Sequence, residues 1–218
     1  MLPIVSVITP TMPGREEYLR QAIACARSQE YPGEIEIIVV TDKPHDIEDG
    51  ADVATWCDRT LGEKRNRGCA EASGEIIVNF DDDDWSAENR IYSQVALLLE
   101  TGKQVTGYDS ILVNETRPLK VFRGDGFYPA SAWWRMHNAG GLAAGTSLCY
   151  RRDWWATHPF PAVQCGEDDQ FWAEAARAGV AVAVDGGNMI CVTNHVGNVS
   201  KRSIGGASWE ELPGDPRD

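Results

Sequence analysis

Short apolar runs alternate with amphipathic segments along the first part of the chain. Residues 4–9 form an apolar run that is rich in β-branched side chains, and residues 34–41 form a second such run. Between them, residues 15–29 carry apolar side chains at helical spacing. A strand, a helix and a strand in this order predict parallel strands, and such sheets bind ligands beyond the carboxyl ends of their strands.

The alternation continues to about residue 193, which predicts one α/β domain. Further strands are expected over residues 75–80, 105–113, 120–122, 144–150, 180–184 and 189–193. Further helices are expected over residues 64–73, 87–101 and 168–178. Residues 124–141 are rich in glycine and aromatic side chains without clear periodicity, as is typical of a binding loop or a lid. We expect the polar tail, residues 205–218, to be loose.

Composition narrows the class of protein. A chain of 218 residues that is 43% apolar, with eight tryptophans, can bury one good core. The net charge of −13 makes nucleic acid a poor general partner, because that affinity comes mainly from Lys and Arg. The six cysteines are scattered, with no CxxC pair, and we expect reduced thiols. There is no apolar stretch of the ~20 residues that a membrane span needs and no basic start of a signal peptide, so we expect a soluble, cytoplasmic protein.

Residues 81–84 are four consecutive aspartates, and they follow the predicted strand 75–80 directly. Adjacent carboxylates repel one another unless a cation or water offsets their charge. Their oxygen atoms suit magnesium, manganese or calcium, and residues two apart on an extended chain face the same side. The alternative is a solvated acidic turn in which Asp84 or Ser86 caps the next helix. The preceding buried strand favours a metal site.

Four motifs, in this order and spacing, resemble the family 2 glycosyltransferases with the GT-A fold. They are residues 5–11 (VSVITPT) followed by Arg15, residues 39–42 (VVTD), residues 64–68 (KRNRG) ahead of 79–84 (NFDDDD), and residues 166–172 (GEDDQFW). The resemblance runs from residue 4 to about residue 200. Each motif alone is weak, but the set is specific.

The resemblance implies a fold and an activity. The fold is a Rossmann-like, mixed but mainly parallel sheet flanked by helices in one domain, residues 1–204. A nucleotide-sugar half covers about residues 1–113 and an acceptor half about residues 114–204, followed by the tail 205–218. The activity is metal-dependent transfer of a hexosyl-type sugar from a nucleotide sugar, most often a UDP-sugar, to an acceptor hydroxyl with inversion at the anomeric carbon.

The resemblance also implies residues for the donor and the metal. Asp83 would coordinate the cation, Mn²⁺ or Mg²⁺, which offsets charge on the departing diphosphate. His195 falls where several relatives supply a histidine to the metal, although a lone histidine after a strand is also commonly just hydrogen-bonded. The donor residues would be Pro10, Thr11, Arg15, Asp42, Arg65, Asp81 and Asp82. For Pro10, Arg15 and Asp42, ordinary loop chemistry is the competing interpretation.

The catalytic base follows from the stereochemistry that the resemblance implies. Inversion in one displacement needs a group opposite the leaving phosphate to take the acceptor's proton, and Asp168 at a helix start is the best candidate, with Asp169 as the substitute. These acids also complement the positive end of the helix. The residues expected to contact the acceptor are Glu167, Trp133 and Trp134. The two tryptophans are included because indole faces stack on sugar rings or bases. The tryptophans are equally suited to the core.

Three alternatives remain open. The acceptor hydroxyl can lie on a glycan, on a lipid-linked sugar or on a hydroxylated DNA base. A DNA base would need a basic strip from Arg117, Lys120, Arg123, Arg135, Arg151, Arg152, Lys201 and Arg202. A non-catalytic nucleotide-sugar or glycan-binding module would keep the metal site without a base. A nucleotidyltransferase would want a glycine-rich basic loop after the first strand, and residues 10–15 contain one glycine and one basic residue.

Overall fold

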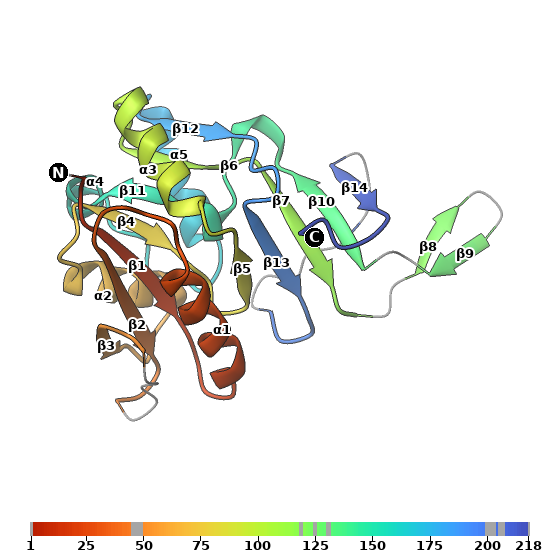
Figure 1. The fold of residues 1–218 in the computed structure, drawn as a ribbon, viewed down its shortest axis with the longest axis horizontal. Helices are drawn as coiled ribbons and strands as arrows, with labels where there is room; N and C mark the ends of the chain where they lie inside the picture. The colour runs from red at the N-terminus through yellow and green to blue at the C-terminus, as the bar shows by residue number, and fades with distance from the viewer. Residues whose placement is uncertain are drawn as a thin grey trace.

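The large central sheet is mixed but mainly parallel, as predicted. The computed structural model describes residues 2–44, 50–117, 120–123, 126–129, 132–198, 204 and 208–217. The seven strands lie in the order β12 (Ala181–Val184), β6 (Val105–Tyr108), β11 (Cys149–Arg151), β4 (Ile76–Asn79), β1 (Val5–Pro10), β2 (Ile35–Thr41) and β3 (Val53–Trp56) (Figure 1). Only β11 runs antiparallel to its neighbours in this sheet.

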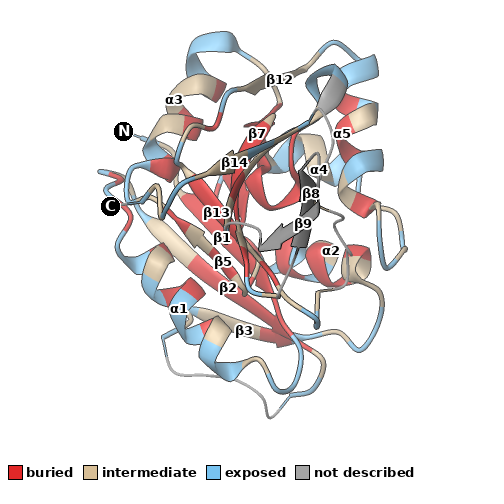
Figure 2. Ribbon diagram, turned by 90° about the vertical axis from the view of Figure 1, so that its right-hand side faces the viewer, coloured by how far each residue is buried: buried red, intermediate tan, exposed pale blue. Residues whose placement is uncertain are grey.

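Helices cover both faces of this sheet. The helices α1 (Glu16–Arg27) and α3 (Arg90–Thr101) pack on one face, where their apolar stripes join side chains such as Val5 and Val7. The helices α2 (Leu61–Glu71) and α5 (Glu167–Arg177) pack on the other face against side chains such as Ile8, beside the short α4 (Arg152–Thr157). Figure 2 shows the buried strands between the two helix layers. Burial on both faces explains why these strands are apolar runs in the sequence.

A smaller sheet of five strands stands beside the first. Its strands are, in order, β14 (Trp209–Leu212), β10 (Trp133–His137), β7 (Ser110–Glu115), β13 (Ile190–Asn194) and β5 (Asp84–Ser86). A third apolar cluster, which includes Trp134, lies on this sheet. The hairpin of β8 (Lys120–Arg123) and β9 (Gly126–Pro129) extends away from both sheets (Figure 1). The sheet therefore joins segments from positions 84 to 212 of the chain.

Several predicted elements differ from the structure. The strand expected over residues 105–113 is wrong, because the chain leaves the large sheet at Asp109 and continues as β7 in the small one. Residues 144–150 hold a short 3₁₀ turn, η2 (Gly145–Ser147), and only then β11. The segment 124–141 contains β9, β10 and a second 3₁₀ turn, η1 (Ala139–Gly141), where no regular structure was expected. The tail is not loose throughout, because β14 pairs with β10.

Three further elements were missed, and two helix starts were misplaced. The strands β3 and β5 and the helix α4 were not predicted. Asp84 and Ser86 lie in β5, so the alternative in which they cap the next helix is wrong, and α3 begins at Arg90. The helix α2 begins at Leu61, three residues early, because Thr60 and Glu63 form a reciprocal capping box. Within the described residues, the helices are too short or too polar for a membrane crossing.

Replacing Thr60 with alanine tests the start of α2. The Thr60 hydroxyl accepts a hydrogen bond from the Glu63 amide at 3.4 Å. We expect Thr60→Ala to lower the free energy of unfolding by about 1 kcal/mol, measured by urea denaturation. Thr60→Ser keeps the acceptor oxygen and serves as the control. An equal loss in both variants would show that the hydroxyl is not what stabilises the helix start.

Candidate active site

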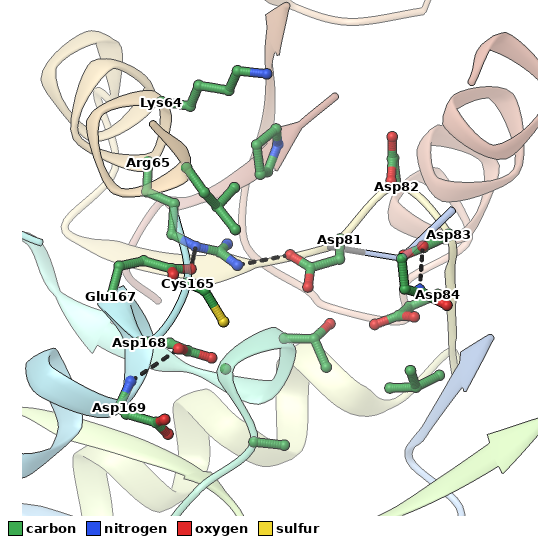
Figure 3. A pocket seen from close by; sticks show the side chains of 18 of the residues that line it. Lys64, Arg65, Asp81, Asp82, Asp83, Asp84, Cys165, Glu167, Asp168 and Asp169 are labelled. Atoms are coloured by element: carbon green, nitrogen blue, oxygen red, sulfur yellow. Dashed lines mark hydrogen bonds and ion pairs between the residues drawn. The ribbon is translucent and has the colours of Figure 1, made fainter. Parts of the chain in front are cut away.

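A cavity of about 320 Å³ opens at the carboxyl ends of β1 and β4. Its walls are the ends of these strands, the start of α2, the four aspartates, residues 142–146, and residues 164–169 at the start of α5. Figure 3 shows the acidic and basic side chains that gather there. The cavity thus lies where a mainly parallel sheet is expected to bind its ligand.

Asp82 is the most buried of the four aspartates, with 2% of its surface exposed. It accepts a hydrogen bond from the Thr11 hydroxyl at 2.7 Å and forms an ion pair with Arg15. Burial raises the pKa of Asp82 to about 6, although Arg15 and Thr11 act to lower it. In Figure 3 its side chain points away from that of Asp81. Asp82 therefore ties the aspartate segment to the loop after β1.

Asp83 contacts side chains from both ends of the chain. Its Oδ2 atom lies 2.9 Å from His195 Nε2, 3.0 Å from Asn198 Nδ2 and 3.1 Å from an Arg15 nitrogen. The Tyr18 ring stacks on the His195 ring at a centroid distance of 5.1 Å, which fixes its plane. The structure therefore brings together the two residues expected to hold a metal.

Arg65 joins Asp81 to the start of α5. It lies 2.9 Å from Asp81 Oδ1 and 3.2 Å from Glu167 Oε1, and it sits between them in Figure 3. Burial lowers the pKa of Arg65, but the charges of Asp81, Glu167 and Asp168 outweigh this and raise it above the ordinary value. Its Nη1 atom is buried without a hydrogen-bond partner among the described residues. Arg65 therefore holds Asp81 and Glu167 through its other two nitrogen atoms, Nη2 and Nε.

Glu167 lines the cavity, but only 2% of its surface is exposed. Burial raises the pKa of Glu167, partly against the effect of Arg65. Its Oε1 atom accepts a hydrogen bond from Arg65 Nε. The residue expected to contact the acceptor is therefore engaged inside the protein.

Asp168 packs against the backbone of η2. A Cβ atom added to Gly145 would lie 1.7 Å from Asp168 Oδ2, so only glycine leaves room for this carboxylate. The other oxygen, Oδ1, accepts a hydrogen bond from the Asp169 amide at 2.9 Å. The helix begins after Gly166, whose φ of 79° lies in the left-handed region that favours glycine. Burial, followed by the charge of Asp168, raises the pKa of Asp169.

Lys64, which was not predicted as a site residue, joins the start of α2 to the ends of β1 and β2. Its Nζ atom donates to the Thr11 carbonyl at 2.8 Å and forms an ion pair with Asp42. Lys64 and Thr11 line the cavity together with Pro10, whereas Asp42 stands behind Lys64. The signal was present, since Lys64 opens the motif 64–68 that contains Arg65. Asn198 and Gly145 were missed as well.

The two tryptophans expected at the acceptor site lie elsewhere. Trp134 is 5% exposed and belongs to the apolar cluster of the small sheet. The Trp133 ring lies 4.6 Å from the Arg217 guanidinium, and neither indole is among the residues that line the cavity. The cavity wall that this part of the fold supplies consists of Met136, Asn138 and Leu142.

The expected metal must be tested against the side chains present. Within the described part of the chain, no group of three or more His, Cys, Asp or Glu residues is placed to hold a metal ion. Asp83 and His195 make a pair of suitable donors. Mg²⁺ keeps several waters and is commonly held by one or two carboxylates together with substrate phosphates. The pair therefore fits a cation that arrives with a diphosphate.

A mainly parallel sheet flanked by helices, with a cavity at its carboxyl edge, is the architecture of the GT-A fold. Residues 53–148 match the model of Glycosyl transferase family 2. The predicted resemblance to the family 2 glycosyltransferases is therefore confirmed over this stretch of the chain. No curated protein matches the chain.

Solved structures show the same fold. The S. aureus TarS 1–349 complex with UDP-GlcNAc is 18% identical with a TM-score of 0.67, covering 92% of this chain and 61% of that one. The 1–349 complex with UDP is 18% identical with a TM-score of 0.64, covering 87% of this chain and 60% of that one. Another S. aureus TarS structure is 17% identical with a TM-score of 0.64, covering 87% of this chain and 36% of that one. The chain thus spans at most about three fifths of these proteins.

Replacing Gly145 with alanine tests the placement of Asp168. The added methyl group would push the carboxylate away from the backbone. We expect Gly145→Ala to lower the turnover of a nucleotide sugar by about 100-fold, because a 1 Å misplacement costs this much, while nucleotide affinity measured by calorimetry stays within about twofold. Gly214→Ala is the control, since a Cβ atom there would meet nothing within 4 Å. Unchanged turnover by Gly145→Ala would remove Asp168 from the reaction.

Proposed function

We propose that this protein is a metal-dependent, inverting glycosyltransferase that moves a hexosyl-type sugar from a UDP-sugar to an acceptor hydroxyl. One observation carries the proposal. The Asp168 carboxylate and the aspartates 81–83 line the same cavity, and buried Arg65 links the two segments through Asp81 and Glu167. A leaving-group site and a base in one cavity are what a single displacement requires. The TarS complexes with UDP and UDP-GlcNAc support the donor class.

The donor would lie along the ends of β1 and β4. We assign the nucleotide to Pro10, Thr11 and Lys64, with Asp42 fixing the Lys64 ammonium. Arg15 balances Asp82 and Asp83 in the structure and stands beside the expected diphosphate position. The sugar would then lie between the aspartates and η2.

Asp168 would act as the base. As the acceptor oxygen attacks the anomeric carbon from the side opposite the diphosphate, Asp168 takes its proton and the bond from that carbon to the phosphate oxygen breaks. Asp83 and His195 would hold a divalent cation, whose positive charge would favour departure of the diphosphate. Asp169, which also lines the cavity, stays the substitute base.

The acceptor is proposed to be a hydroxyl on a glycan or a lipid-linked sugar. Several arginines of the basic strip that a DNA acceptor would need already contact glutamates of the protein. Arg117 bonds both oxygens of Glu115, and Arg135 lies 3.8 Å from Glu210. Lys201 and Arg202 lie outside the described residues. With a net charge of −13, these contacts favour a carbohydrate acceptor over DNA.

Replacing Asp168 with asparagine tests the base. The amide keeps the shape of the side chain but cannot take a proton at neutral pH. We expect Asp168→Asn to lower UDP-GlcNAc turnover by about 10²- to 10⁴-fold with UDP affinity nearly unchanged. Asp169→Asn is the matched control and should lose far less. Equal loss of turnover and of UDP binding in a folded Asp168→Asn protein would argue for a binding module instead.

Replacing Asp83 with alanine tests the metal. We expect the gain in UDP affinity that Mn²⁺ provides to fall by about tenfold or more in Asp83→Ala, because one of the two protein ligands is lost. Calorimetric titration with UDP, with and without Mn²⁺, measures that gain. Exposed Asp58→Ala is the control for the change in net charge. A full Mn²⁺ effect in Asp83→Ala would contradict the assignment of this ligand.

A further inference from the structure

Arg90, the first residue of α3, is a fully buried cation whose hydrogen bonds go to neutral oxygens. Its exposed fraction is 0%. Nε donates to Gln94 Oε1 at 3.1 Å, and Nη1 donates to the Ser86 hydroxyl at 2.8 Å. Nη2 donates to the carbonyl of Asn79 at 2.7 Å and to that of Thr146 at 2.6 Å. The guanidinium also lies 4.2 Å from the centre of the Phe80 ring.

The two carbonyls that share Nη2 come from two walls of the cavity. Asn79 ends β4, two residues before Asp81. Thr146 lies in η2, directly after Gly145, the residue against which Asp168 packs. One nitrogen atom therefore holds the backbone that leads to the aspartates and the backbone that supports the Asp168 carboxylate.

Neighbouring bonds reinforce the same junction. Asn79 Nδ2 donates to the Gly145 carbonyl at 3.2 Å, and the Asn79 amide donates to the Leu148 carbonyl at 2.9 Å. Gln94, which accepts from Arg90, donates from Nε2 to the Ser147 carbonyl at 2.5 Å. Arg90 and Gln94 thus bind neighbouring residues of η2 from the same helix.

Burying an arginine side chain at this position costs free energy. Moving such an ion out of water costs several kcal/mol, and a hydrophobic side chain of similar volume commonly does as well for stability. Burial lowers the pKa of Arg90 to about 10, which leaves it charged at neutral pH. The planar guanidinium offers donors in fixed directions, as lysine does not. What arginine adds here is the direction of its bonds.

We propose that Arg90 is a positioning residue that sets the distance between the donor aspartates and Asp168, through the carbonyls of Asn79 and Thr146. This inference rests on the proposed function, because it gives Asp168 its role as the base. The nucleotide contacts at Thr11 and Lys64 come from other segments, so Arg90 affects the chemical step more than donor binding.

The test replaces Arg90 with lysine and measures turnover per binding site. Calorimetry with UDP and Mn²⁺ gives the affinity and the number of competent sites, and hydrolysis of UDP-GlcNAc gives the turnover. We expect UDP affinity within about twofold of wild type and a loss of turnover per site of about tenfold or more. A merely destabilised protein would lose sites and turnover in proportion.

A double-mutant cycle separates positioning from a general structural effect. If Arg90 acts through Asp168, Arg90→Lys should lower turnover by less than about twofold when Asp168→Asn is already present. The control is Arg152→Lys, since Arg152 also donates to a backbone carbonyl, that of Ala72 at 2.6 Å. Ala72 directly follows α2 and is not part of η2. That variant should turn over normally.

If Arg90→Lys does not fold, the variant Gln94→Leu provides the test instead. It removes the acceptor of Arg90 Nε and the bond to Ser147, and it should show the same loss per site and the same dependence on Asp168. Wild-type turnover per site in the folded variant, or an equal loss in both backgrounds, would overturn the inference alone. Absence of any UDP-sugar hydrolysis by the wild-type protein would instead overturn the proposed function, and this inference with it.

Discussion

Charge balance at the end of β4 is the constraint on which the site depends. Three adjacent carboxylates, those of Asp81, Asp82 and Asp83, are gathered there, and burial raises the pKa of Asp82. Arg65 offsets the first and Arg15 the other two, and these arginines come from different segments of the chain. The same ion pairs therefore hold the loop after β1 and the start of α2 against the aspartates. Breaking one would leave an uncompensated charge in a partly buried position, which costs more than the pair contributes.

The sequence predicted the large sheet better than the small one for a physical reason. Strands such as β1 and β2 are buried on both faces, so they are continuous apolar runs. The small sheet pairs segments that are far apart in the chain, and β5 has only three residues. Local periodicity carries no information on such pairing. The break at Asp109 is invisible for the same reason, since the residues on both sides of it are equally apolar and buried.

In the site, residues that carry charge at strand ends could be predicted, whereas residues that act through shape could not. The aspartates and Asp168 stand out because acids gathered beside apolar elements need an explanation. Gly145 has no chemistry of its own, and its importance follows from the carboxylate that packs on it. Trp134 shows the opposite case, because an indole suits a ligand site and a core equally well. Only its 5% exposure places it in the core.

The reversed direction of β11 has a consequence for how such a protein can diversify. In a wholly parallel sheet, every loop at the ligand edge follows a strand. Because β11 runs the other way, the loop that precedes it, with η2, reaches the same edge. That loop arrives from β10 of the small sheet, whereas the ends of β1 and β4 lead to the opposite wall. Insertions or deletions upstream of η2 can therefore reshape one wall of the cavity while the strands of the large sheet keep their register.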